Sequence, residues 1–225
     1  VNSPRPGSDE ISRAYEEGWV MGGERRRAIA FLGDVVAPNG RWHAEVFIVD
    51  LPRNLTLAGD APLEGTATRR PAPPRGVAQR RLTFTAERKY PGVATTPRHW
   101  LRASPDGSQI AFLMKDDAGI VQLWNVSPRG GEPRQITRNA TDMASAFTWS
   151  PDATVIAHVM DGSVCVTEIA TGRTRRLTER RSGTEAPLPF ACVFSPDGEH
   201  IAFMRQVTSG GATFAQIFTV PFSKP

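Results

Sequence analysis

The sequence predicts an all-β fold, a portion of a β-propeller with about four blades of four antiparallel strands. Three observations lead to this prediction. The tripeptide Ser-Pro-Asp occurs at Ser104, Ser150 and Ser195, so that 46 and 45 residues separate the copies. Each copy precedes a dense apolar run, and each run is followed by further strand-like segments. A period of about 45 residues made of short strands is typical of propeller blades.

Each copy of the tripeptide has the chemistry of a tight turn. Proline presets the first turn dihedral, aspartate bonds the backbone ahead of it, and glycine adopts the left-handed conformation at little cost. Ala153 replaces that glycine in the second copy, where we expect strain. The predicted structural turn residues are Ser104, Pro105, Asp106, Gly107, Ser150, Pro151, Asp152, Ser195, Pro196, Asp197 and Gly198.

The strands of each unit follow its turn. The apolar runs contain few polar residues, which is typical of a strand covered on both faces. A third strand comes next, and a fourth follows in two of the three units. The runs are residues 110–114, 155–160 and 201–204, the third strands 120–126, 163–169 and 215–220, and the fourth strands 130–137 and 171–178.

A more divergent copy lies upstream, with strand-like segments at residues 27–34, 44–52 and 80–85. The Pro- and Gly-rich insert 53–78 interrupts it and predicts a long surface loop. We expect residues 1–26 to form a lead-in with a short helix capped by Ser8 or Asp9. The predicted divisions are 1–26, a divergent blade at 27–84, blades at 85–138 and 139–179, and a last blade at 180–225 that lacks its fourth strand.

Several segments resemble a known family. The Ser-Pro-Asp-Gly, Ile-Ala-Phe and Leu-Thr signatures resemble the WD40-like repeats of TolB-type β-propellers. The stretches "RPGSDEISRAYEEGWV", "RPAPPRG", "RRLTF" and "TPRHWLRASP" resemble the bacterial YidR-like family, which has no established activity. That family is about twice as long, so the resemblance implies that this chain is its C-terminal half. It also implies that the strand closing the last blade lies in the other half, which leaves an open arc here.

Composition narrows the classes of partner. The formal net charge of +4 comes mainly from scattered arginines interleaved with acids, so the sequence predicts no nucleic-acid partner. No apolar run reaches the roughly 18 residues of a membrane span, so we expect no membrane insertion. Cys165 and Cys192 lie in apolar segments and are interpreted as reduced packing residues.

No constellation of catalytic residues stands out, so the sequence predicts neither a catalytic residue nor a cofactor. Some propeller lyases that cut acidic sugars hold a metal with several histidines at the axial channel, and only His99 has the corresponding position here. The equivalent places in the next two blades are Ser145 and Phe190. A metal needs three or four converging ligands, so we predict no metal site.

The segment from Arg98 through His99 to Trp100 is the predicted ligand-binding site. Placed just before an innermost strand, it would reach the channel mouth, where Arg and Trp suit an acidic or sugar ligand. The alternative is that the tryptophan fills space between blades.

Two functions remain open. The favoured one is a noncatalytic propeller scaffold that binds a protein or small ligand through its loops or axial channel. The other is a metal-dependent lyase or hydrolase acting on acidic saccharides, with most of its ligands in the other half of the protein.

Overall fold

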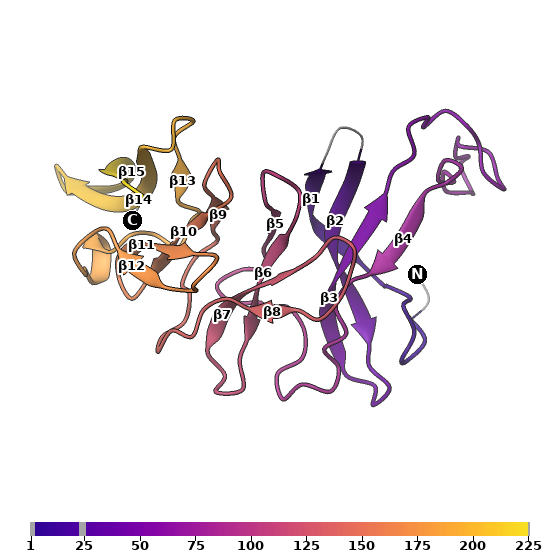
Figure 1. Cartoon of the computed structure of the whole chain (residues 1–225), viewed down its shortest axis with the longest axis horizontal. Coiled ribbons are helices and arrows are strands. Elements are labelled where there is room, and N and C mark those ends of the chain that lie inside the picture. Colours follow the sequence, from indigo (N-terminus) through magenta and orange to yellow (C-terminus); the bar gives the residue numbers. More distant parts are fainter. Residues whose placement is uncertain (1–2, 23–25, 225) are drawn as a thin grey trace.

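The computed structural model describes residues 3–22 and 26–224 and consists of four antiparallel sheets. The sheets follow one another in chain order, and the first and the fourth lie at opposite ends of an open arc (Figure 1). First strands of adjoining sheets contact each other, β1 with β5 and β9 with β13. The prediction of an all-β propeller portion is confirmed.

Three sheets have four strands, and the sheet at the C-terminal end has three. In each, hairpin neighbours in sequence are neighbours in space, in the orders β1-β2-β3-β4, β5-β6-β7-β8, β9-β10-β11-β12 and β13-β14-β15. The strands are β1 (Ala14–Gly22), β2 (Arg26–Val36), β3 (Trp42–Asp50), β4 (Ala78–Arg81), β5 (Leu101–Ala103), β6 (Ile110–Lys115), β7 (Val121–Val126), β8 (Arg134–Gln135), β9 (Thr148–Trp149), β10 (Val155–Met160), β11 (Ser163–Glu168), β12 (Thr174–Arg176), β13 (Val193–Phe194), β14 (His200–Ser209) and β15 (Ala212–Pro221). A 3-10 turn, η1 (Gly183–Glu185), precedes β13.

The repeated turns join the first and second strands of three sheets. In the second sheet the Ser104 hydroxyl bonds the Asp106 carboxylate, and the Gly107 N–H donates to the Ser104 carbonyl at 2.8 Å. Gly107 and Gly198 have φ of 67° and 75°, and Ala153 has φ of 61°. The alanine therefore holds the left-handed conformation that the glycines adopt in the other two turns.

Ala153→Gly is expected to raise the free energy of unfolding by about 0.5–1 kcal/mol, because it removes the contact of a Cβ with the backbone in the left-handed region. Urea unfolding of the variant and the parent measures the change. Ala186→Gly is the control, since Ala186 has φ of −65° and gains nothing from a glycine. A loss of stability in Ala153→Gly would contradict the strain assigned to this turn.

In three sheets a threonine that follows a leucine or, at Thr137, an isoleucine ties the fourth segment to the third strand. Its side-chain oxygen accepts a hydrogen bond from a backbone N–H of that strand, which extends the ladder after the fourth strand has ended. The bonds join Val46 N to Thr83 Oγ1 at 2.9 Å, Leu123 N to Thr137 Oγ1 at 2.9 Å and Val164 N to Thr178 Oγ1 at 3.0 Å.

A buried polar residue precedes each of these three N–H groups, namely Glu45, Gln122 and Ser163. In the first sheet it is Glu45, whose carboxylate accepts hydrogen bonds from the Thr85 N–H at 2.7 Å and from the Arg81 guanidinium at 3.0 Å. The hydroxyls of Thr83 and Thr85 also donate to it, and the His43 ring lies 3.0 Å away. Every neighbour of this carboxylate is a potential donor.

Gln122 has the equivalent position in the second sheet and a different set of neighbours. Its Oε1 accepts from the Thr137 hydroxyl at 2.7 Å and from the Asn139 N–H at 3.1 Å. Its Nε2 donates to the Asp116 carboxylate at 3.0 Å and to the Asn139 carbonyl at 2.9 Å. The Gln122 amide thus meets both donors and acceptors, whereas the Glu45 carboxylate meets donors alone. The hydrogen-bonding groups around each side chain therefore suit that side chain.

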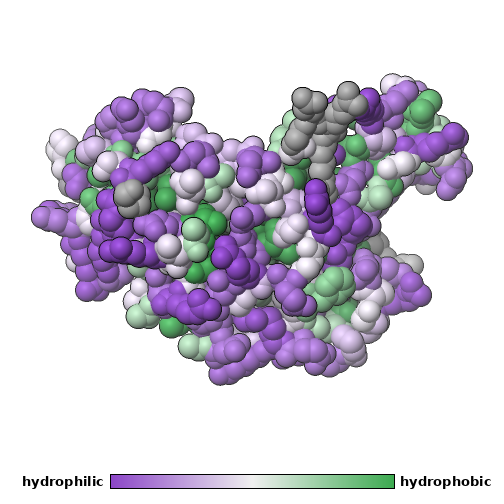
Figure 2. Space-filling view, viewed as in Figure 1, coloured by the Kyte–Doolittle hydropathy of each residue, from purple (hydrophilic) through white to green (hydrophobic). Residues whose placement is uncertain are grey.

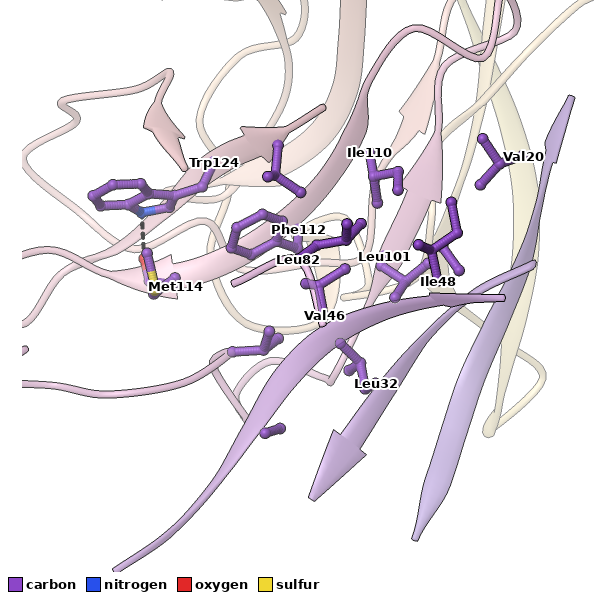
Figure 3. Close-up of a cluster of buried hydrophobic side chains, with 14 of the residues drawn as sticks. Val20, Leu32, Val46, Ile48, Leu82, Leu101, Ile110, Phe112, Met114 and Trp124 are labelled. Carbon is purple, nitrogen blue, oxygen red and sulfur yellow. Dashed lines mark hydrogen bonds between the residues drawn. The ribbon is translucent and has the colours of Figure 1, made fainter. Parts of the chain in front are cut away.

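The apolar core between the first two sheets is drawn in Figure 3. Side chains from β2 and β3 on one side meet those of β6 on the other, with Phe112 fully buried among them. The Trp124 indole N–H donates to the Met114 carbonyl at 2.9 Å and closes one side of the cluster (Figure 3). Residues 110–114 are buried throughout, as predicted for a strand covered on both faces.

Two tryptophans exchange hydrogen bonds between the second and third sheets. The Trp100 indole N–H donates to the Phe147 carbonyl at 3.0 Å, and the Trp149 indole N–H donates to the Arg102 carbonyl at 3.0 Å. Each ring therefore reaches the chain segment that holds the other ring. A buried indole N–H needs such a partner, and here each partner lies on the neighbouring blade.

The predicted helix near the N-terminus is wrong. Ser8 and Asp9 cap no helix, and the segment after them forms β1, which pairs with β2 from Ala14 to Gly22. A register shift between Tyr15 and Gly18 marks a β-bulge, with φ of 53° at Glu16. Pairing with β2 gives the backbone N–H and C=O groups of this segment hydrogen-bond partners and buries Val20. These gains outweigh the helix propensity of the segment.

The insert between β3 and β4 forms a largely exposed loop that carries one isolated bridge, Ala58 to Pro74. Hydrophilic residues dominate the face shown in Figure 2, with apolar side chains in small patches. Exposed apolar residues include Trp19 and Met21 on β1 and Phe214 and Ile217 on β15. No helix within residues 3–22 and 26–224 is long and apolar enough to cross a membrane.

Candidate functional site

The site lies on what we call the approach face, the face of the arc where the chain enters each first strand. The β2–β3, β6–β7, β10–β11 and β14–β15 hairpins turn on this face because consecutive strands are antiparallel. The Ser-Pro-Asp turns join first to second strands and so lie on the opposite face. Segments from adjacent blades therefore meet on the approach face.

The predicted residues Arg98, His99 and Trp100 lie directly before β5 on this face. Arg98 is exposed, and the other two are half-buried. The guanidinium groups of Arg98 and Arg102 lie over the Trp100 ring, 5.0 and 4.2 Å from its centroid. Because its N–H is also bound by the next blade, Trp100 positions this segment against the third sheet.

The His99 ring packs against the first sheet. It contacts the Tyr15 ring edge to face, with 5.1 Å between centroids. The Tyr15 hydroxyl donates to Asp34 at 2.8 Å, and the Arg13 guanidinium bonds the same carboxylate at 3.3 Å. Residues from β1 and the position before it, from β2 and from the segment before β5 thus form one group, which we call the axial cluster: Arg13, Tyr15, Glu16, Asp34, Arg98 and His99.

Charges within the axial cluster are balanced. Arg98 bonds Glu16 at 3.1 Å, and Arg13 bonds Asp34. Burial lowers the pKa of His99 below its ordinary value, although the Asp34 carboxylate opposes the effect. Burial and the Asp34 hydrogen bond raise the pKa of Tyr15 to about 12. At neutral pH the cluster therefore presents a neutral imidazole, a phenol and two ion pairs, a surface suited to hydrogen bonding.

The other histidines have structural surroundings. His43 contacts Glu45, and His158 is fully buried with its Nε2 2.9 Å from the Thr167 hydroxyl. Burial lowers the pKa of His158 to about 4. Of the positions equivalent to His99, Ser145 is buried and its hydroxyl accepts from the Val159 N–H, whereas Phe190 is exposed. Among the residues described, no three His, Cys, Asp or Glu side chains are grouped so as to hold a metal ion.

Both cysteines are buried and free. Burial raises the pKa of Cys165 to about 11 and that of Cys192 to about 12. At neutral pH both are thiols rather than thiolates, which suits packing and not nucleophilic chemistry.

Comparison with known proteins finds relatives of this chain. No family model matches the chain. The uncharacterised protein YidR of Escherichia coli K12 is 53% identical over 206 residues, which cover 90% of this chain and 48% of YidR. The chain is similar to YidR and has a TolB-like propeller fold. The YidR-like chain spans about half the length of this relative. The tricorn protease homolog 1 of Streptomyces coelicolor is 28% identical over 160 residues, 68% of this chain and 14% of that protein.

Solved structures share the fold of the YidR-like chain. TolB from Acinetobacter baumannii superposes with a TM-score of 0.50 at 20% identity, over 88% of this chain and 41% of TolB. An oligogalacturonate lyase in complex with manganese gives a TM-score of 0.50 at 14% identity, over 94% of this chain and 66% of the lyase. At these identities the likeness describes the architecture alone.

Of the six residues of the axial cluster in the YidR-like chain, the sequence predicted only Arg98 and His99 as site residues. Tyr15 and Glu16 lie in the lead-in for which a short helix was predicted, and Asp34 lies at the end of the predicted strand 27–34. The available signal was the alternation in "AYEEGWV", which fits a strand once the bulge is allowed for.

Proposed function

We propose that the chain is part of a noncatalytic TolB-like propeller scaffold, which binds a protein segment or a small polar ligand at the axial cluster. The observation that carries this proposal is the convergence of Tyr15, Arg98 and His99 from two blades at the start of their first strands. Rigid sheets position these side chains, and loops from neighbouring blades surround them.

The charge balance refines the ligand class. Arg98 is neutralised by Glu16, so the cluster has no surplus positive charge to attract an acidic saccharide. Its imidazole, phenol and ion pairs suit a ligand that offers hydroxyl or amide groups. A peptide backbone or an uncharged sugar supplies these groups.

The alternative is a metal-dependent lyase or hydrolase acting on acidic saccharides. The fold likeness to an oligogalacturonate lyase with manganese favours it. The part of this chain that the structure describes does not itself fit such a metal, since no group of three ligating side chains is present. In this alternative the ligands come from the rest of the longer protein.

The proposal is tested on the full-length parent with the double variant Arg98→Ala/His99→Ala. A thermal-shift screen of neutral oligosaccharides and short peptides first finds a binding probe. Calorimetry is then expected to show roughly tenfold weaker binding in the double variant, because contacts made directly by the cluster are lost. Arg173→Ala, an exposed change on the opposite face, is the control and should leave the affinity unchanged.

Two outcomes would contradict the proposal. One is unchanged affinity in the double variant. The other is turnover of oligogalacturonate by the parent together with stoichiometric bound metal, which would support the lyase.

A further inference from the structure

A second region of the approach face is positively charged, whereas the charges of the axial cluster are balanced. A pocket of ≈ 240 Å³ opens between the first two sheets, away from the axial cluster. The β2–β3 hairpin, the segment after β4 and the end of β6 enclose it. Its side chains with polar or aromatic chemistry are Arg41, Trp42, Lys89, Tyr90, Thr95 and Lys115. We call it the lysine pocket.

Two ammonium groups flank one aromatic ring in this pocket. The Lys89 and Lys115 Nζ atoms lie 5.3 and 5.5 Å from the Tyr90 ring centroid. The chain has three lysines in all, so two of them meet at this one tyrosine, although they lie 26 positions apart in sequence. The backbone at Gly119 packs against the Tyr90 hydroxyl and helps to fix the ring, since a Cβ there would lie 3.2 Å from the oxygen.

Among the residues that the structure describes, no carboxylate lines the lysine pocket to balance these charges. The nearby Asp116 side chain accepts from the N–H groups of Ala118 and Ile120 and from Gln122, which directs it into its own turn. The Asp117 carboxylate lies 3.6 Å from Arg88 and is largely exposed. The Lys89 ammonium group donates to the Asp117 backbone carbonyl at 3.2 Å. Three cations therefore share one concavity, an arrangement that an anion stabilises.

Aromatic surface adjoins this positive charge. Trp42 is 54% exposed at the start of β3, and it lines the pocket next to Arg41. An exposed indole and a half-buried phenol offer flat faces for a ring, while lysine and arginine offer donors to an oxyanion. The two kinds of contact lie close enough to be used by one small molecule.

We propose that the lysine pocket binds a small ligand in which a phosphate or carboxylate group is attached to a ring. The anion lies between Lys89, Lys115 and Arg41, and the ring stacks against Trp42 or Tyr90. This site is separate from the axial cluster and goes beyond the function proposed above. Its affinity depends on salt, because exposed charges supply much of the attraction.

The test uses phenyl phosphate as probe, with inorganic phosphate for the anion alone, phenol for the ring alone and benzoate for the carboxylate. Calorimetry at low ionic strength is expected to show that phenyl phosphate binds more tightly than inorganic phosphate or phenol. Lys89→Gln/Lys115→Gln is expected to weaken this binding roughly tenfold or more, and Trp42→Ala should remove the advantage over inorganic phosphate. Benzoate binding of similar strength assigns the site to carboxylates as well, and its absence assigns the site to phosphates.

The matched control is Arg129→Gln/Arg173→Gln, which removes the same charge from the opposite face. Because Lys89 and Lys115 are exposed, their replacement leaves the near-ultraviolet circular dichroism unchanged. The proposal is overturned if the lysine variant binds phenyl phosphate as the parent does, or if the control weakens binding equally. Equal binding of phenyl phosphate and inorganic phosphate would overturn the role of the ring. Arg98→Ala/His99→Ala should leave the affinity for phenyl phosphate unchanged. The two proposed sites are therefore tested independently of each other.

Discussion

Replacing Phe112 by alanine is expected to lower the free energy of unfolding by about 3–5 kcal/mol. Phe112 is fully buried on β6, with the first sheet on one side and its own sheet around it (Figure 3). Truncation removes a whole ring from the joint between two blades, where rigid sheets cannot collapse into the space. Urea unfolding followed by tryptophan fluorescence measures the loss.

The control for this truncation is Phe214→Ala on β15. Its ring is 51% exposed, so the same chemical change should cost less than about 1 kcal/mol. Equal losses in the two variants would show that the joint between the first two blades contributes no special stability.

Glu45→Gln is expected to destabilise the chain by about 3–5 kcal/mol, although it changes one atom. Only potential donors surround the Glu45 carboxylate: Arg81, Thr83, Thr85 and His43. A glutamine would turn its NH₂ group toward some of them and remove the buried carboxylate that pairs with Arg81, which leaves that guanidinium only the exposed Asp9 carboxylate at 3.4 Å as a charged partner. Glu87→Gln, an exposed change of the same kind, is the control.

The same substitution should alter the pH dependence of stability. Burial raises the pKa of Glu45, but the hydrogen bonds from His43, Thr83 and Thr85 and the charge of Arg81 outweigh it, so the folded-state pKa is lowered. A lowered pKa contributes stability that is fully present above the unfolded value of about 4.3 and is lost as pH falls through the folded value. In Glu45→Gln the loss of folding stability that this carboxyl group causes at low pH should be absent. An unchanged decline would contradict the role assigned to the carboxylate.

The reciprocal variant Gln122→Glu tests whether the equivalent site in the second sheet also discriminates between glutamate and glutamine. Its new carboxylate would face the Asp116 carboxylate and the Asn139 carbonyl, which now accept from the amide. Both swaps should therefore destabilise, even though each places in one sheet the residue that the other sheet uses. Stability in either swap would show that these two sites do not discriminate between the side chains.

The parts of the fold that repeat were predictable because local chemistry repeats with them. The turn at Ser104 and the buried run after it follow from proline, aspartate and apolar patterning, and Ala153 has the left-handed φ that its place in the repeat requires. β1 was mispredicted because its strand state depends on pairing with β2 rather than on its own residues. Local propensity carries no information about such a partner.

The candidate sites were less predictable for the same reason. Arg98 was predicted to face an acidic or sugar ligand, but it pairs with Glu16, which is 82 positions away in sequence. Lys89 and Lys115 were visible in the sequence as two of very few lysines, yet nothing there places both beside Tyr90. Charge balance at a surface is set by contacts between blades, and a single sequence does not encode these contacts locally.

The bonds exchanged by Trp100 and Trp149 bear on how a blade of this protein can be transplanted. A graft cut between the second and third sheets would separate each indole from the carbonyl it needs. The smallest transferable cassette on this side therefore includes both sheets and the two segments that lead into β5 and β9. Homologous recombination that respects the 46-residue repeat but exchanges one blade alone would have to restore both donor–acceptor pairs at the new seam.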